Sequence, residues 1–267
     1  MRALAAVFRI NFDQQIQYRV AALAGLATQY AFGFMYIRMY LAFYQSNPSA
    51  FPLTLPELMS YMWLQQGLLT AMMLWFLDQT IFDDIVSGNV AYEFCRPVDL
   101  YRYWFIRNVS RRLARVVLRM VPLFLVAALL PAPYTLLPPP NLYQAVMFVI
   151  SLALAFYLVN TLGMLMYAAT FYTMNPMGVR MLFASLVDLL AGSIVPIPLF
   201  PEAVRRVLEL LPFGSMQNAA FLIYSGHIGP DRMAQTLLLQ VFWCIALTLL
   251  GRALFSRMQQ RISIQGG

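Results

Sequence analysis

Six long apolar stretches alternate with shorter polar connections along the chain. Most are long enough to cross the hydrocarbon core of a bilayer as a helix of about 20 residues. In lipid, a helix satisfies its backbone hydrogen bonds internally. We therefore expect an all-α integral membrane protein with six transmembrane helices. The expected spans are residues 20–44, 58–82, 116–130, 142–172, 181–195 and 233–255.

The residues before the first span have a different pattern. Leu4, Phe8, Phe12 and Ile16 recur at four-residue spacing, and polar and charged residues occupy another side. That spacing is typical of an amphipathic helix lying among lipid headgroups. Residues 1–19 are therefore expected to form an interfacial helix. Their scattered charges leave no apolar core for a cleavable signal, so the spans themselves are expected to direct insertion.

Composition supports a membrane protein and limits what else the chain contains. Hydrophobic residues make up 61% of the 267 residues and charged residues 11%, against roughly 45–50% and about 25% in soluble domains. One transmembrane domain over residues 1–267 is expected, because the spans and their connections leave no room for a large soluble domain. Cys95 and Cys244 are far apart, and their spacing fits neither a disulfide framework nor a zinc site.

The basic residues indicate the orientation of the spans. All 18 are arginines. Fourteen of them gather before the first span, between the second and third, after the fourth and at the end of the chain. Residues 45–57 and 131–141 contain none, and among the opposite connections only the longer segment before the sixth span has any, namely Arg205, Arg206 and Arg232. Arginine-rich loops are cytoplasmic, so both termini are expected in the cytoplasm. The lipid bilayer is the expected partner of these arginines, and no nucleic acid is expected, because they are divided among separate loops.

The connection between the second and third spans, residues 78–113, is the most charged stretch. Residues 80–86 are expected to continue the second span as a short helix that Gly88 stops. Asp99 is a good N-cap for the helix that follows. An acidic, glycine-broken helical elbow of this kind in the cytoplasm is suited to docking against another protein.

A stripe of arginines at four-residue spacing follows the elbow. The helix after Asp99 carries Arg107, Arg111, Arg115 and Arg119. Arginines near the membrane are typical snorkelling anchors, and Arg111 and Arg112 fit that role. The anchoring role explains the stripe but does not explain the acidic elbow before it.

A second segment, residues 193–231, lies on the expected external side. Pro201 with Glu202 is a good first helical turn, and an apolar stretch over residues 213–224 is too short to cross the bilayer. Asp231 is expected to cap the sixth span. The pattern predicts a broken helix pair that dips into the outer leaflet and returns, which a bilayer tolerates where the backbone is helical or packed against protein. The alternative is an ordinary amphipathic surface helix.

The order of these segments resembles the permease subunit of bacterial type-2 ABC transporters, a family that exports drugs, lipids and polysaccharides. The resemblance covers nearly the whole chain and includes a G-x-x-A-x-x-x-x-R-P stretch after the elbow. In this chain the stretch is formed by Gly88, Ala91, Arg96 and Pro97.

The resemblance implies a function, a location and partners. The chain would be the permease of an ATP-driven exporter in a bacterial inner membrane, and a second permease chain, identical or homologous, would complete the path. Separate ABC ATPase subunits would bind ATP and Mg²⁺ beneath the elbow, so this chain would need no cofactor of its own. The implied coupling helix contains Phe82, Asp83, Asp84, Ile85 and Gly88, with Glu93, Arg96 and Pro97 behind it.

Catalytic motifs are missing from the sequence. A phosphate-binding G-x-x-x-x-G-K-[ST] loop is excluded because the chain has no lysine. The single histidine, His227, lies in the external segment, and no H-E-x-x-H motif accompanies it. We therefore expect no enzyme activity in this chain. Two other functions stay open: a membrane scaffold or sensor subunit that does not transport, and a six-span secondary transporter.

Among the charged residues within the expected spans, Asp78 lies near the cytoplasmic end of the second span and is assigned to the elbow, whereas two others lie away from the cytoplasmic ends. Asp188 lies near the middle of the fifth span and Arg38 toward the outer end of the first. A charge within the bilayer is costly unless it is paired or hydrated, so both are candidates for the translocation path. The alternatives are that Arg38 snorkels outward and that Asp188 is protonated or bonded to a neighbouring helix.

Overall fold

The computed structural model describes residues 2–17, 19–94 and 98–265, and this part of the chain is all α, with no strand. The all-α prediction is therefore confirmed. The α-helices are α1 (Arg2–Ile16), α2 (Arg19–Ser46), α3 (Leu55–Gly67), α4 (Leu69–Met72), α5 (Gln79–Ser87), α6 (Val90–Phe94), α7 (Leu100–Leu129), α8 (Leu142–Thr173), α9 (Pro176–Leu190), α10 (Glu202–Leu210), α11 (Gln217–Ser225) and α12 (Pro230–Gln265). Three short 3₁₀ helices join them: η1 (Pro48–Ala50), η2 (Leu74–Phe76) and η3 (Ile197–Leu199).

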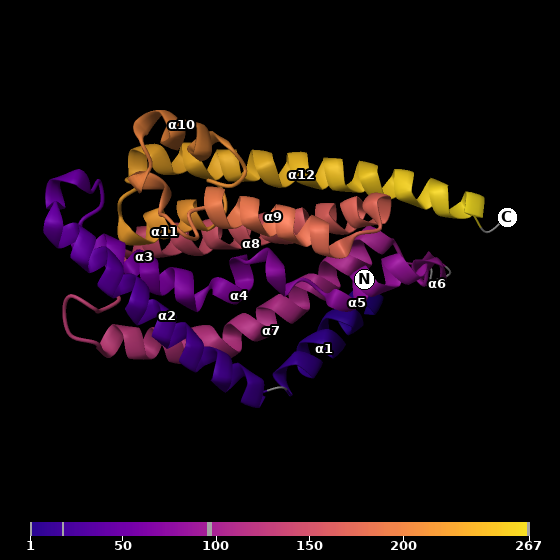
Figure 1. The fold of residues 1–267 in the computed structure, drawn as a ribbon, viewed down its shortest axis with the longest axis horizontal. Helices are drawn as coiled ribbons and strands as arrows, with labels where there is room; N and C mark the ends of the chain where they lie inside the picture. The colour runs from indigo at the N-terminus through magenta and orange to yellow at the C-terminus, as the bar shows by residue number, and fades with distance from the viewer. Residues whose placement is uncertain (1, 18, 95–97, 266–267) are drawn as a thin grey trace.

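α8, α9 and α12 run along the long axis of the molecule, and α2 and α7 are inclined to it (Figure 1). α8 packs along α12, α11 packs on α8, and α1 packs against α7. The beginning of α1 and the end of α12 lie toward the same end of the molecule as α5 and α6, whereas α10 and α11 lie toward the opposite end (Figure 1). The two segments singled out in the sequence, residues 78–113 and 193–231, thus begin at opposite ends of the bundle.

Among the residues that the structure describes, two helices are long and apolar enough to cross a membrane: α8 and the Pro230–Gln260 part of α12. Their outward faces carry large apolar side chains, among them Leu142, Leu238 and Leu249. An extended exposed apolar surface of this kind is typical of a protein that contacts a membrane or another apolar partner.

The centre of the molecule is the second half of α8, which is enclosed on all sides. Side chains from Leu158 to Ala168 are buried without interruption, as expected for a helix that is apolar around its whole circumference. Gly163 allows Leu77 to approach closely, since a Cβ at this position would lie 2.6 Å from the Leu77 Cδ2.

The second predicted span is wrong as a continuous helix over residues 58–82. α3 ends at Gly67, α4 ends at Met72, and α5 begins only at Gln79. Between α4 and α5 the backbone of Met73, Leu77 and Asp78 is extended around the short η2. The helix is broken in the second half of this stretch, and the side chains that stabilise the break are described below.

Other boundaries differ by smaller amounts. α9 begins at Pro176, before the expected residue 181, because Asn175 accepts a hydrogen bond from the Gly178 N–H at 2.9 Å and Pro176 is compatible with the first turn. α7 is one helix over the residues expected to form both the elbow helix and the third span, and Asp99 caps it as expected. α12 begins at Pro230, so Asp231 lies in its first turn instead of capping it. α10 begins at Glu202, as predicted.

Candidate functional site

α5 is a short helix with a defined stop at each end. The Asp78 carboxylate accepts a hydrogen bond from the Thr80 N–H at 3.1 Å, which caps the first turn. Gly88 ends the helix with a φ of 80°, and its N–H bonds to the Ile85 carbonyl. Glycine adopts this left-handed conformation without a Cβ clash. The predicted stop at Gly88 is confirmed, but α5 is a separate helix and does not continue the second span.

The side chains of α5 divide into a buried face and an outward face. Phe82 and Ile85 are buried in the core of the chain, and the centre of the Phe82 ring lies 4.7 Å from the centre of the Tyr167 ring. Asp83 is exposed and Asp84 is partly exposed. Of the residues expected in the coupling helix, these carboxylates and the exposed Gly88 are therefore available to a partner, whereas Phe82 and Ile85 position the helix. Arg96 and Pro97 lie outside the described residues.

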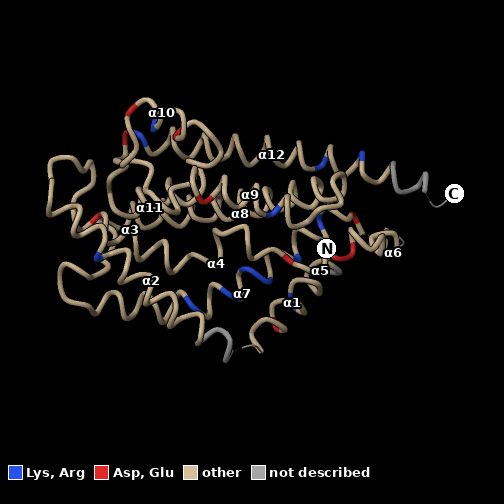
Figure 2. The backbone as a smooth tube through the Cα atoms, viewed as in Figure 1, with Lys and Arg blue, Asp and Glu red and all other residues tan. Residues whose placement is uncertain are grey.

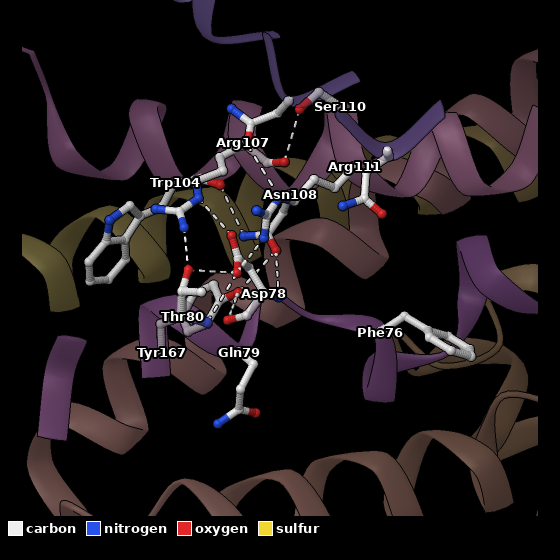
Figure 3. Close-up of polar contacts among 12 residues, drawn as sticks. Phe76, Asp78, Gln79, Thr80, Trp104, Arg107, Asn108, Ser110, Arg111 and Tyr167 are labelled. Carbon is white, nitrogen blue, oxygen red and sulfur yellow. Dashed lines mark hydrogen bonds and ion pairs between the residues drawn. The ribbon is translucent and has the colours of Figure 1, made fainter. Parts of the chain in front are cut away.

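A buried double ion pair fixes the base of α5. The Asp78 side chain is 1% exposed and lies 2.6 Å from the Arg107 Nε and 2.5 Å from the Arg111 Nη1. The Tyr167 hydroxyl lies 3.0 Å from the Asp78 backbone N–H and donates to the Asn108 Oδ1 at 3.0 Å. Figure 3 shows the carboxylate between the two arginines, with Asn108 and Tyr167 beside it. The beginning of α5 is thus bonded to α7 and α8.

Glu93 of α6 belongs to the same network. Its Oε1 lies 3.7 Å from the Arg107 Nη1, and its other oxygen accepts a hydrogen bond from the Trp104 indole N–H. Arg107 also donates to the Thr80 hydroxyl. The predicted position of Glu93 behind α5 therefore has a physical basis: it contacts the arginine that binds the base of that helix.

Arginine side chains cap the carbonyl groups of the broken helix. Arg112 donates to the Ala71 and Met73 carbonyls at 2.7 and 2.9 Å, and Arg115 donates to the Phe76 carbonyl at 3.1 Å. Arg180 of α9 donates to the Trp75 carbonyl at 2.9 Å. Buried carbonyls without a partner are strongly disfavoured, so these contacts explain how the backbone can leave the helical conformation here.

The structure corrects the expected role of Arg112 as a snorkelling anchor. Its side chain is fully buried, and it binds backbone carbonyls within the protein instead of reaching lipid headgroups. Arg111 likewise binds Asp78, and it donates to the Asn11 side chain at 3.2 Å. Arg115 donates to the Gln15 side chain at 3.0 Å. The arginine stripe therefore joins α7 to α1 and to the broken helix.

The candidate path residues are not brought together. Arg38 is exposed, with its guanidinium 5.6 Å from the centre of the Tyr134 ring. Asp188 is partly buried on α9, and within the described part of the chain no cation pairs with it.

The Asp78 network holds α5 in position through ion pairs and hydrogen bonds. Among the described residues, no group of three or more His, Cys, Asp or Glu side chains is arranged to hold a metal ion. The sequence contained one signal for this network, the four-residue spacing of Arg107 and Arg111. Asp78 was assigned to the elbow, but nothing in the sequence indicated that it meets both arginines.

Comparisons with known proteins give no relative for this chain: no family model matches the sequence, and no curated protein matches it. Its function is therefore proposed from its residues and their geometry.

Proposed function

We propose that the chain is the membrane permease subunit of an ATP-driven exporter of the type-2 ABC class, and that separate ATPase subunits dock on α5. One observation carries the proposal: α5 is a capped helix that presents Asp83 and Asp84 outward while its base is bonded to the transmembrane bundle through Asp78. A helix that is exposed on one face and rigidly anchored on the other is suited to transmit a push from a bound partner.

The arrangement of the long helices supports the membrane placement. In the proposed topology, α2, α3 with α4, α7, α8, α9 and α12 are the six spans of a bacterial inner-membrane protein. α5 lies toward the end of the bundle where α1 begins and α12 ends (Figure 1), which agrees with cytoplasmic termini. α1 lies against α7 and would be the interfacial helix. Figure 2 shows charges near α5 and α6 and near α10, and few along α8.

In the proposed mechanism, motion passes from α5 to α7 and α9 through the side chains that contact α5. Closure of two ATPase subunits, which hold ATP and Mg²⁺, would push α5. Because the helix break separates α5 from α3, the push would pass through Arg107 to α7 and through Arg180 to α9. Arg180 donates to the Gln79 side chain, and its guanidinium lies 5.3 Å from the centre of the Phe82 ring. A second permease chain, identical or homologous, would complete the path.

Reversing the charge of the outward face of α5 tests the docking role. Asp83→Arg with Asp84→Arg is expected to reduce ATPase association at least about tenfold, because like charges across an interface cost several kcal/mol. The measurement is co-purification of a Walker-motif ATPase with the tagged chain from native membranes. As a control, Glu202→Arg with Asp231→Arg reverses two exposed carboxylates near the opposite end and should leave association unchanged.

The result also separates the alternative functions. If no Walker-motif ATPase accompanies the unaltered chain, the proposal fails, and a scaffold, a sensor subunit or a secondary transporter takes its place. If the α5 double variant binds the ATPase and exports normally, the docking role of α5 is refuted. Ion coupling in a secondary transporter would depend chiefly on Asp188, the one carboxylate expected near the middle of a span.

Asp188 and Arg38 remain the candidates for the translocation path. Asp188→Asn removes a partly buried charge while keeping the shape of the side chain. We expect export, measured as substrate efflux from cells, to fall, and ATPase association to be unchanged. Normal export by this variant would remove Asp188 from the path.

A further inference from the structure

α10 has its apolar side facing outward, the reverse of a helix on a soluble protein. Val207 and Leu210 are 58% and 65% exposed, whereas Leu208 packs into the core. Four charged residues occupy another side and line a cavity: Glu202, Arg205, Arg206 and Glu209. At the outer surface of a membrane, this orientation places the apolar face in lipid and keeps the polar face on the cavity.

The cavity lies between α10, α11 and the beginning of α12 and has a volume of about 550 Å³, which is within the range of small-molecule sites. Ser215 and Asn218, which are 2% and 3% exposed, also line it. Asn218 accepts a hydrogen bond from the Tyr61 hydroxyl at 3.2 Å through its Oδ1. Asn218 and Ser215 therefore place an amide and a hydroxyl group at the wall of the cavity.

The cavity has one positive charge that is not balanced. Arg205 lies 3.9 Å from the Glu209 carboxylate, and Arg206 pairs with Glu202. Arg232 also lines the cavity and has no ion pair among the described residues. It lies in the first turn of α12, where the positive end of the helix dipole adds positive potential. Asp231 beside it does not line the cavity.

We propose that this cavity binds the phosphate-bearing headgroup of an anionic membrane amphiphile. Arg232 contacts the phosphate, and Asn218 with Ser215 binds polar groups of the headgroup. Leu210 lines the cavity and is also exposed, so it offers an apolar exit for an acyl chain toward the outer face of α10. The inference rests on the membrane placement given under the proposed function, but it does not depend on ATPase docking.

Photolabelling of the full chain in lipid nanodiscs tests the site. The probe is phosphatidylglycerol with a photoreactive group beside its headgroup phosphate, and the matching phosphatidylcholine is the comparison. We expect phosphatidylglycerol to label peptides of α10 and the beginning of α12. Arg232→Gln should lower this labelling about tenfold or more, because a hydrogen bond to a charged group is lost. Arg257→Gln, which alters an exposed arginine near the other end of α12, should not lower it.

Each outcome bears on the proposal. Equal labelling by the two lipids, or labelling that Arg232→Gln leaves intact, overturns it. Complete competition by inorganic phosphate at the lipid's own concentration overturns the amphiphile and assigns the cavity to a soluble anion. ATPase association measured on the same samples separates the two proposals, because loss of labelling with association intact refutes only the lipid site. Labelling without any associated ATPase refutes only the exporter.

Discussion

Asp78→Ala is expected to lower the free energy of unfolding by about 3–5 kcal/mol. Removing one partner of a buried ion pair leaves an uncompensated buried charge, which is strongly destabilising. Here two guanidinium groups lose their carboxylate, since Arg107 and Arg111 both bind Asp78 and their side chains are only 13% and 16% exposed. The N-cap of α5 is lost as well, which adds about 1 kcal/mol.

Two further variants separate the contributions of charge and cap. Asp78→Asn keeps an oxygen that can cap the Thr80 N–H but removes the negative charge, so its loss of stability should be smaller than that of Asp78→Ala. Asp83→Ala removes an exposed carboxylate of the same helix, which accepts a hydrogen bond from the Gln79 side chain at 2.9 Å. This control should change stability by less than about 0.5 kcal/mol.

The measurement is unfolding of the purified protein in detergent, monitored by circular dichroism against denaturant. An Asp78→Ala variant as stable as the Asp83→Ala control would show that the ion pairs contribute nothing net. The base of α5 would then be held by Phe82, Ile85 and the backbone bond to Tyr167 instead.

Local features of the fold could be predicted from the sequence. The ends of α8 follow from one long apolar stretch that begins after Asn141, and the stop at Gly88 follows from glycine in a Ser-Gly-Asn setting. Asp99 was recognised as an N-cap because its side chain needs only an N–H group three residues along its own chain. Each of these signals depends on neighbours in the sequence, so the sequence alone contains the information.

The break in the second span could not be predicted in this way. Residues 68–77 contain neither proline nor glycine, and their apolar pattern favours a continuous helix. The donors that replace the helical hydrogen bonds come from Arg112, Arg115 and Arg180, far along the chain. The sequence shows that arginines are present but not which of them face inward, and its pattern favours Arg112 as a lipid anchor. Tertiary contacts here outweigh local propensity.

Arg112→Ala tests whether these donors stabilise the break, and we expect it to lower the free energy of unfolding by about 2–4 kcal/mol. The Ala71 and Met73 carbonyls would lose their side-chain donor, and each buried acceptor left unpaired costs about 1–3 kcal/mol. Within the described part of the chain, the Nε and Nη2 of Arg112 have no hydrogen-bond partner. Burying the guanidinium is therefore itself unfavourable, and removing it offsets part of the loss.

Arg102→Ala is the matched control, because Arg102 is an exposed arginine on the same helix and should change stability by less than about 0.5 kcal/mol. Arg112→Lys should fall between the two, since an ammonium group can donate to both carbonyls but lacks the planar fork of the guanidinium. Hydrogen exchange gives a second readout: protection of α5 amides should fall in Arg112→Ala because the break no longer holds α5 in place. If Arg112→Ala were as stable as the control and α5 stayed protected, Arg115 and Arg180 would be sufficient to hold the unwound backbone, and Arg112 would not be needed for the break.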